Sequence, residues 1–155
     1  SGDEAGPNGG APPRPARFVS WNGPAKAAAA WRGDACTVGD LGRLDDEGYL
    51  YLEGRRSDLV ITGGVNVYPL EVERALLEHP QVHEAAVFGV PDERWGQRVC
   101  AAVVGELSPA DVDDWLDARV APFKRPKTVG VVDALPRISM GKVRRNRLGP
   151  ELGVE

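Results

Sequence analysis

The stretch that decides the fold is GRRSDLVITGGVNVYPLEVERAL, residues 54–76. The apolar run at residues 59–61 predicts a short strand, which ends at a pair of glycines. Pro69 suits the first turn of a helix, because the N–H that proline lacks has no intrahelical partner there. Apolar side chains then recur at three- and four-residue spacings until Pro80, so this helix is expected to bury one face.

The sequence on either side of this stretch predicts a hairpin and further strands. Residues 41–44 and 49–53 flank an acidic turn that contains glycine, a composition typical of a β-hairpin. Apolar runs predict three more strands, at residues 85–90, 99–104 and 129–132.

A second helix is expected after the second of these three strands. Ser108 has the side chain of an N-cap, Pro109 takes the first helical position, and Asp111 is placed to close a capping box with Ser108. We therefore predict an α+β fold: a small three-stranded sheet with flanking helices, preceded by a β-hairpin.

The overall composition argues against several classes of protein. Of the 155 residues, 42% are hydrophobic and 27% are charged, as in folded globular domains. The formal net charge of −4 argues against a nucleic-acid partner. No apolar run approaches the ~20 residues that cross a bilayer, so no membrane span is expected, and the expected compartment is the cytoplasm. The two cysteines and two histidines lack the spacing of zinc ligands, so no metal site is predicted.

A basic loop near the C-terminus ends on a lysine. Pro136 and Gly141 bracket this loop, and Lys142 follows the glycine. A lysine presented by a glycine turn can neutralise negative charge on a phosphate or a carboxylate. The segment is not a P-loop, because Val143 stands where Ser or Thr is needed. Taken alone, it is more typical of a solvated basic tail.

Other segments carry residue types that suit a nucleotide. Arg55 can meet a hydroxyl or a phosphate. Gly63 and Gly64 let the backbone approach a ligand, although two glycines also simply form a turn from a strand to a helix. Asp40 can accept two hydrogen bonds from a diol such as a ribose, but aspartate is equally common in turns. The cluster at residues 123–127 combines three cations with one aromatic ring, which suits a nucleobase and a phosphate as well as a solvated loop.

The order of these segments along the chain is more informative than any one of them. In that order, the motifs are Gly39-Asp40-Leu41-Gly42, Asp46-Glu47-Gly48-Tyr49-Leu50, Gly54-Arg55, Gly63-Gly64, Tyr68-Pro69, Glu71-Val72-Glu73, Val90-Pro91-Asp92, Trp95-Gly96 and Gly141-Lys142. As a set they resemble the C-terminal part of adenylate-forming enzymes, most closely acyl-CoA synthetases that act on aryl and fatty acids. The resemblance extends from about Asp34 to Leu148.

The resemblance implies a two-step ligation. ATP activates a carboxylic acid to an acyl-adenylate, and the thiol of CoA then takes the acyl group. A large N-terminal domain holds ATP and the acid, and a small C-terminal lid domain turns between the two half-reactions. By position, Lys142 resembles the lysine that contacts the acid and the α-phosphate during adenylation. Mg²⁺ is expected with ATP, although the chain offers no ligand for it.

The resemblance also assigns roles to other residues. Asp40 resembles the aspartate that binds the ribose hydroxyls, and Arg55 the arginine that assists it. Gly63 and Gly64 resemble the loop that lines the pantetheine tunnel. Ser57 occupies the hinge position, where the family usually has Asp or Lys. The residues that resemble the CoA nucleotide contacts are Phe123, Arg125 and Lys127.

The domain organisation implied by the resemblance has three parts. Residues 1–16 are a flexible tail or linker rich in glycine and proline, residues 17–57 are the trailing edge of the large domain plus the hinge, and residues 58–155 are the lid. Inside the second part, the alanine-rich run at 25–31 favours a helix. The rest of the large domain is expected as a partner, in cis or in trans, and without it the chain is expected to be inactive.

Two alternatives stay open at this point. One is the lid of a peptide-synthetase adenylation domain, which acts with a carrier protein in place of CoA. The other is a non-catalytic interaction domain that keeps the same fold.

Overall fold

The computed structural model describes residues 25, 28, 31–32, 35–36 and 39–154. The chain divides into two compact units, Ser1–Gly39 and Asp40–Glu155. In the first unit, β1 (Trp31–Arg32) pairs antiparallel with β2 (Ala35–Cys36). The helix predicted at 25–31 is confirmed at Ala25 and Ala28, which are helical, and is wrong at Trp31, which lies in a strand. The predicted tail at residues 1–16 lies outside the described residues.

The second unit begins with the predicted hairpin, formed by β3 (Asp40–Leu44) and β4 (Leu50–Arg55). Its turn is organised by the Asp45 carboxylate, which accepts hydrogen bonds from the backbone N–H groups of Glu47 and Tyr49 at 3.0 and 2.9 Å. The bond from Tyr49 contributes most to a lowered pKa of Asp45, because it favours the ionised form. A short 3-10 turn, η1 (Arg56–Asp58), follows the hairpin.

The predicted α+β class is confirmed. In the described part of the chain the main sheet has five strands in the order β6-β5-β8-β7, with β9 paired to β8. Strands β7 (Val82–Asp92), β8 (Gly96–Gly105) and β9 (Thr128–Val131) are the three predicted ones. Strands β7 and β8 run antiparallel, and β9 runs parallel to β8. Strands β5 (Val60–Thr62) and β6 (Val65–Val67) extend the sheet.

One detail of the decisive stretch differs from expectation. Gly63 and Gly64 do not connect a strand to a helix; they form the tight turn between β5 and β6. Their φ angles are +56° and +79°, the left-handed pair that a two-residue hairpin turn requires. Strand β6 escaped prediction because its residues are few and include Asn66, so that pairing with β5 decides its conformation.

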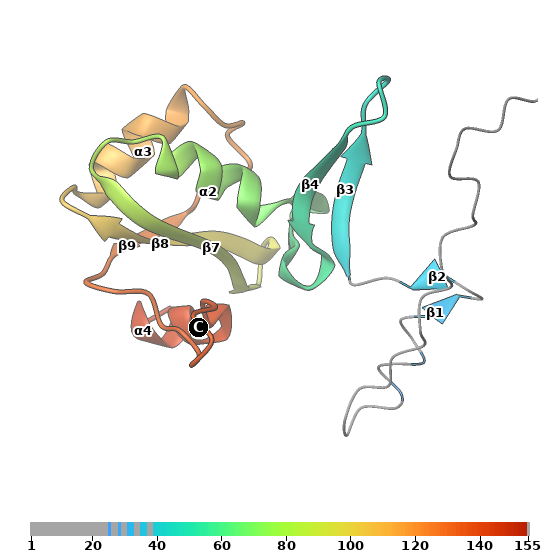
Figure 1. Ribbon diagram of the computed structural model, residues 1–155. Coiled ribbons are helices and arrows are strands. Elements are labelled where there is room, and N and C mark those ends of the chain that lie inside the picture. The colour runs from blue at the N-terminus through green and yellow to red at the C-terminus, as the bar shows by residue number, and fades with distance from the viewer. Residues whose placement is uncertain (1–24, 26–27, 29–30, 33–34, 37–38, 155) are drawn as a thin grey trace, which may run out of the picture. The chain divides into compact units, whose positions relative to one another are not determined.

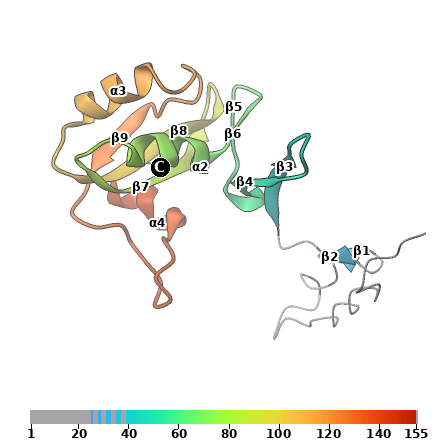
Figure 2. The same cartoon turned by 45° about the horizontal axis from the view of Figure 1, so that its top comes forward.

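Helices cover both faces of the sheet (Figure 1). The predicted helices α2 (Pro69–Leu77) and α3 (Pro109–Asp117) lie on one face, and α4 (Arg145–Glu151) lies on the other, as Figure 2 also shows. Helix α4 was not predicted, because its short sequence contains Gly149 and Pro150, both poor helix formers. Burial of Leu148, which is 1% exposed, outweighs that preference. No helix among the described residues is both long and apolar enough to span a membrane.

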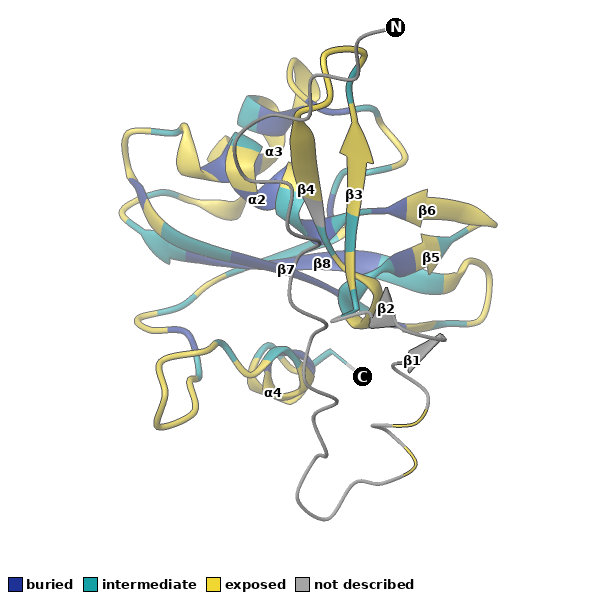
Figure 3. Cartoon of the chain, turned by 45° about the vertical axis from the view of Figure 1, so that its right-hand side comes forward, coloured by how far each residue is buried: buried dark blue, intermediate teal, exposed yellow. Residues whose placement is uncertain are grey.

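Two apolar clusters meet at β8, which Figure 3 shows as a buried central strand. Alternate residues Val99, Ala101 and Val103 belong to the cluster beneath α2 and α3. Cys100 and Ala102, which point the other way, belong to the cluster that contains Leu148 of α4. The Cys100 thiol is free, and burial raises its pKa.

The start of α3 carries the predicted capping box. The Ser108 hydroxyl accepts from the Asp111 N–H at 3.3 Å, and the Asp111 carboxylate accepts from the Ser108 N–H at 2.8 Å and from the Ser108 hydroxyl at 2.7 Å. The hydroxyl bond is the largest cause of a lowered pKa of Asp111. The capping box fixes where α3 begins, and hence which of its side chains reach the sheet.

Leu116→Ala should lower the free energy of unfolding by about 2–5 kcal/mol, because Leu116 is 0% exposed and its loss leaves a cavity. Urea denaturation measures the change. Leu77→Ala is the matched control: Leu77 is 49% exposed, so its truncation should cost less than about 0.5 kcal/mol. Similar losses for the two variants would contradict the described core.

Asp111→Asn should remove a stabilisation that depends on pH. A carboxyl group whose pKa is lowered by folding contributes stability above its unfolded pKa, near 3.8, and loses it as pH falls through the folded pKa. The difference in unfolding free energy between parent and variant should therefore be largest at neutral pH and should shrink in acid. Urea titrations from about pH 6 towards about pH 2 measure it. A constant difference would show that the capping carboxylate is not the cause.

Candidate functional site

One open pocket collects three of the predicted site residues. Asp40, Arg55 and Lys142 all line a cavity of about 320 Å³, to which the hairpin, α2 and the start of α4 also contribute residues. The other residues that line it are Leu52, Gly54, Asp58, Pro69, Leu70, Glu73 and Arg145. Residues separated by about a hundred positions in the chain thus reach one concave surface, which presents both cations and carboxylates.

Asp40 and Arg55 face each other across the hairpin. They are register partners on β3 and β4, and Arg55 Nε lies 3.5 Å from Asp40 Oδ1. The Asp40 side chain remains 36% exposed and that of Arg55 53%. Both groups are therefore held together while keeping polar atoms available to a ligand, which is what binding of a diol requires.

Lys142 extends from a small hairpin-like loop. Arg137 and Val143 form an antiparallel bridge, and Ile138 N–H donates to the Lys142 carbonyl at 2.9 Å. At the tip, Gly141 has φ +80°, and its carbonyl accepts from Arg137 Nη1 at 2.6 Å. Arg137 also pairs with Glu84 on β7, which fixes the loop to the sheet. Within the described part of the chain, the exposed Lys142 ammonium makes no hydrogen bond or ion pair, so it is available to a ligand.

The predicted hinge residue lies in η1. Ser57 is exposed, and its hydroxyl donates to Asp58 Oδ1 at 3.0 Å. The second carboxylate oxygen of Asp58 accepts from Arg145 Nη1 at 3.0 Å. The backbone next to the hinge position is therefore linked, through a side chain, to the first residue of α4.

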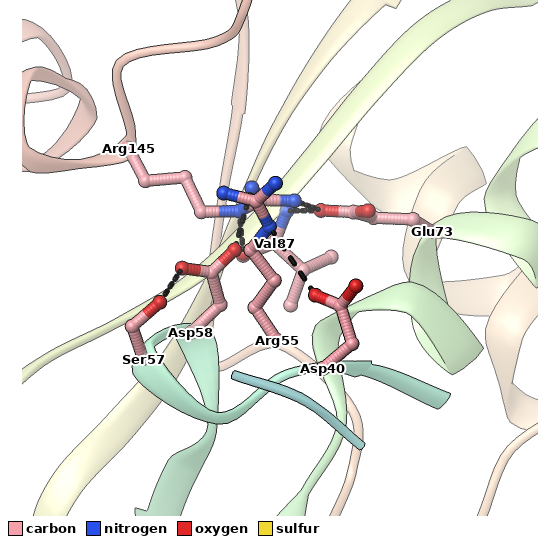
Figure 4. Close-up of polar contacts among 7 residues, drawn as sticks. All are labelled: Asp40, Arg55, Ser57, Asp58, Glu73, Val87 and Arg145. Carbon is pink, nitrogen blue, oxygen red and sulfur yellow. Dashed lines mark hydrogen bonds and ion pairs between the residues drawn. The ribbon is translucent and has the colours of Figure 1, made fainter. Parts of the chain in front are cut away.

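Sequence analysis missed the two residues that complete this link, Glu73 and Arg145 (Figure 4). Arg145 Nη2 donates to Glu73 Oε1 at 2.7 Å, and Arg145 Nε donates to the Val87 carbonyl at 3.2 Å. Glu73 Oε1 also accepts from the Val87 N–H at 2.8 Å. A signal was present: Glu73 lies on the buried stripe of α2, and a carboxylate at a core position requires a partner.

The glycine turn between β5 and β6 lies beside the turn between β7 and β8. Gly63 N–H donates to the Trp95 carbonyl at 2.8 Å. A Cβ atom on Gly63 would lie 3.1 Å from Trp95 Cε3, whereas one on Gly64 would meet nothing within 4 Å. Gly63 is therefore required both by its φ angle and by the neighbouring indole ring, and Gly64 by its φ angle alone.

The predicted CoA cluster is more strongly paired than the sequence indicates. Arg125 is bound by two aspartates of α3, with Nη2 2.7 Å from Asp113 Oδ1 and Nη1 in contact with Asp117. The Asp113 hydrogen bond is the largest cause of a raised pKa of Arg125. Phe123 is 45% exposed, and Lys127 is exposed beside Arg125 in a second open pocket. Among the described residues, no group of His, Cys, Asp and Glu side chains is arranged to hold a metal ion.

Gly63→Ala should destabilise the chain more than Gly64→Ala. A non-glycine residue in the left-handed region costs about 1–2 kcal/mol of stability, and both variants pay this cost. In Gly63→Ala the new methyl group also crowds the Trp95 ring. Urea denaturation of both variants measures the difference. The excess should disappear when both are compared in a Trp95→Ala background. Equal losses in the parent background would contradict the described packing of the two turns.

The comparisons with known proteins identify the type of domain that the chain contains. Residues 71–142 match the family of AMP-binding enzyme C-terminal domains. The long-chain-fatty-acid–CoA ligase FadD13 of Mycobacterium tuberculosis is 40% identical over 131 residues, which are 83% of this chain and 26% of that enzyme. ATP-bound MatB from Rhodopseudomonas palustris has a TM-score of 0.75 and 44% identity, covering 84% of this chain and 27% of its own.

A third relative was solved with a reaction intermediate. The o-succinylbenzoate CoA synthetase MenE of Bacillus subtilis, in complex with the acyl-adenylate OSB-AMP, has a TM-score of 0.74 and 44% identity, covering 78% of this chain and 25% of that enzyme. The chain thus spans about a quarter of the length of the relatives it matches. It carries an AMP-binding enzyme C-terminal domain, and the relatives that it matches are adenylate-forming acyl-CoA ligases.

Proposed function

We propose that this chain is the lid of an acid–CoA ligase and supplies the adenylation lysine, Lys142. The observation that carries the proposal is the shared pocket of Asp40, Arg55 and Lys142. This concave surface carries an exposed carboxylate and an ammonium that no described residue binds, which suits a ribose and an adjacent α-phosphate. We further propose the cytoplasm as its compartment, because ATP and CoA are cytoplasmic substrates.

In the proposed adenylation step, Asp40 accepts hydrogen bonds from the ribose hydroxyls and Arg55 holds that carboxylate in place. Lys142 lies opposite the carboxylic acid and the α-phosphate. Its positive charge stabilises the negative charge on the α-phosphate oxygens as the carboxylate attacks phosphorus and pyrophosphate leaves. Mg²⁺ would arrive with ATP and would be held outside this chain.

The exposed apolar side chains of the hairpin support a large domain as the partner. Five large apolar side chains of the β3–β4 hairpin are 45–68% exposed, which is unusual for a surface that meets only water. These residues are Leu44, Tyr49, Leu50, Tyr51 and Leu52. We propose that they pack against the rest of the N-terminal domain that the full-length relatives possess.

For the thioester step we propose the Gly63–Gly64 turn as one wall of the pantetheine path and the 123–127 cluster as the CoA nucleotide surface. Lys127 and Phe123 are exposed and suit this role directly. Arg125 would have to exchange Asp113 and Asp117 for a phosphate, so its contribution to CoA affinity should be smaller. A carrier protein is the alternative thiol donor, and the relatives named as CoA ligases favour CoA.

The test joins the full chain to the large domain of a relative and measures the two half-reactions separately. Lys142→Ala should lower the rate of acyl-adenylate formation on the order of a hundredfold or more, because a positioned cation opposite phosphate charge is lost. Thioester formation from preformed acyl-adenylate should change far less, because the lid has turned and Lys142 has left the phosphate. Pyrophosphate release and acyl-CoA production are the two readouts.

Arg144→Ala is the matched control, since it removes a neighbouring exposed cation and should leave both rates near the parent's. Equal losses in the two half-reactions for Lys142→Ala would indicate a role in folding. Full adenylation activity in that variant would favour the non-catalytic interaction domain.

A further inference from the structure

Arg145 bonds to three parts of the lid domain at once. Its three guanidinium nitrogens donate separately to Asp58 after the hinge position, to Glu73 on α2 and to the Val87 carbonyl on β7. The arginine itself opens α4, three residues after Lys142. A lysine ammonium also has three N–H donors, but all are on one nitrogen, so lysine would not reach these three separate acceptors as the three nitrogens of the guanidinium do.

The anchor of this arrangement is buried. The Glu73 side chain is 9% exposed, against 27% for Arg145 and 23% for Asp58. Strand β7 is the last strand on its side of the described sheet, so Val87 has no strand partner on its outer edge. Its N–H donates to Glu73 and its carbonyl accepts from Arg145, which satisfies both backbone groups. Glu73 and Arg145 are thereby fixed to the sheet and do not move as surface side chains do.

Two ion pairs bracket the hinge position. On the hairpin side, Arg55 is paired with Asp40 across the two strands. On the lid side, Asp58 is paired with Arg145. Between these fixed points lie only Arg56 and Ser57, both exposed. If the lid turns, the backbone angles can therefore change only at these two residues without breaking either ion pair.

We propose that Arg145 is a positioning residue that locks the lid-side end of the hinge and the base of the Lys142 loop to the buried Glu73 carboxylate. The pivot is thereby confined to Arg56 and Ser57, and Lys142 moves as one body with the lid. The consequence for catalysis rests on the proposed function, whereas the coupling of hinge and loop is a property of the chain alone.

The first test measures hydrogen exchange on the full chain and needs no partner domain. Arg145→Ala should speed amide exchange by at least about tenfold in two separate segments, residues 58–60 and 142–147, because both lose their fixed contact. Asp58→Asn should speed exchange only in the first segment, since it breaks only the hinge arm. Arg144→Ala, which removes a neighbouring exposed cation, should leave both segments unchanged.

The amides of β8 at residues 99–103 report whether each variant is still folded. If they also exchange faster in Arg145→Ala, Arg145→Lys takes its place, because it keeps a positive charge beside Glu73 while losing the three-way contact; it should loosen both segments. The proposal is overturned if the arginine variant loosens only one segment, or if Asp58→Asn leaves residues 58–60 protected.

The second test uses the fusion with a relative's large domain. Arg145→Lys should lower kcat for adenylation by about tenfold with KM for ATP near the parent value, because Lys142 is displaced while the ribose contacts remain. Adding Asp58→Asn to this variant should lower kcat little further, because Arg145→Lys has already removed the contact with Asp58. Losses that multiply independently would overturn the coupling. If Lys142→Ala has no effect in the same fusion, the proposed function fails while the exchange result stands.

Discussion

The side chains of β8 alternate between two apolar clusters, so this strand is buried on both faces. A strand in that position needs a covering layer on each side. On one side α2 and α3 supply it; on the other, Leu148 of α4 and Leu135 do so. The Lys142 loop leads directly into α4, so packing beneath the sheet determines where the lysine is presented.

A small polar network inside this apolar frame holds together the elements that carry the candidate site. Burying the Glu73 carboxylate is costly unless its lone pairs are used, and Val87 and Arg145 use them. Arg145 also binds Asp58, which lies 87 residues earlier in the chain, so the partner of the buried Glu73 carboxylate also holds the segment after the hinge position. The same bonds satisfy the N–H and the carbonyl of Val87 on the edge strand β7.

The Lys142 loop and the attachment of the lid to the hairpin are held in different ways. The Lys142 loop is held by backbone hydrogen bonds and by the Arg137–Glu84 pair, so the position of the ammonium is set relative to the sheet. The attachment to the hairpin, by contrast, passes through exposed residues. In the proposed function, the lid turns as a rigid body about these exposed residues and exchanges one functional face for another.

The sequence by itself determined the elements whose signals are local. The hairpin turn at Asp45, the capping box of Ser108 and Asp111, and the apolar runs of β7 and β8 depend on neighbours along the chain, and all were predicted. The ordered motifs also determined the family. Tertiary structure decided the rest. Strand β6 and helix α4 exist because β5 and Leu148 stabilise short segments of weak propensity. Arg145 joins Asp58 to Glu73 because folding brings distant charges to the outer edge of β7, and no local pattern encodes that proximity.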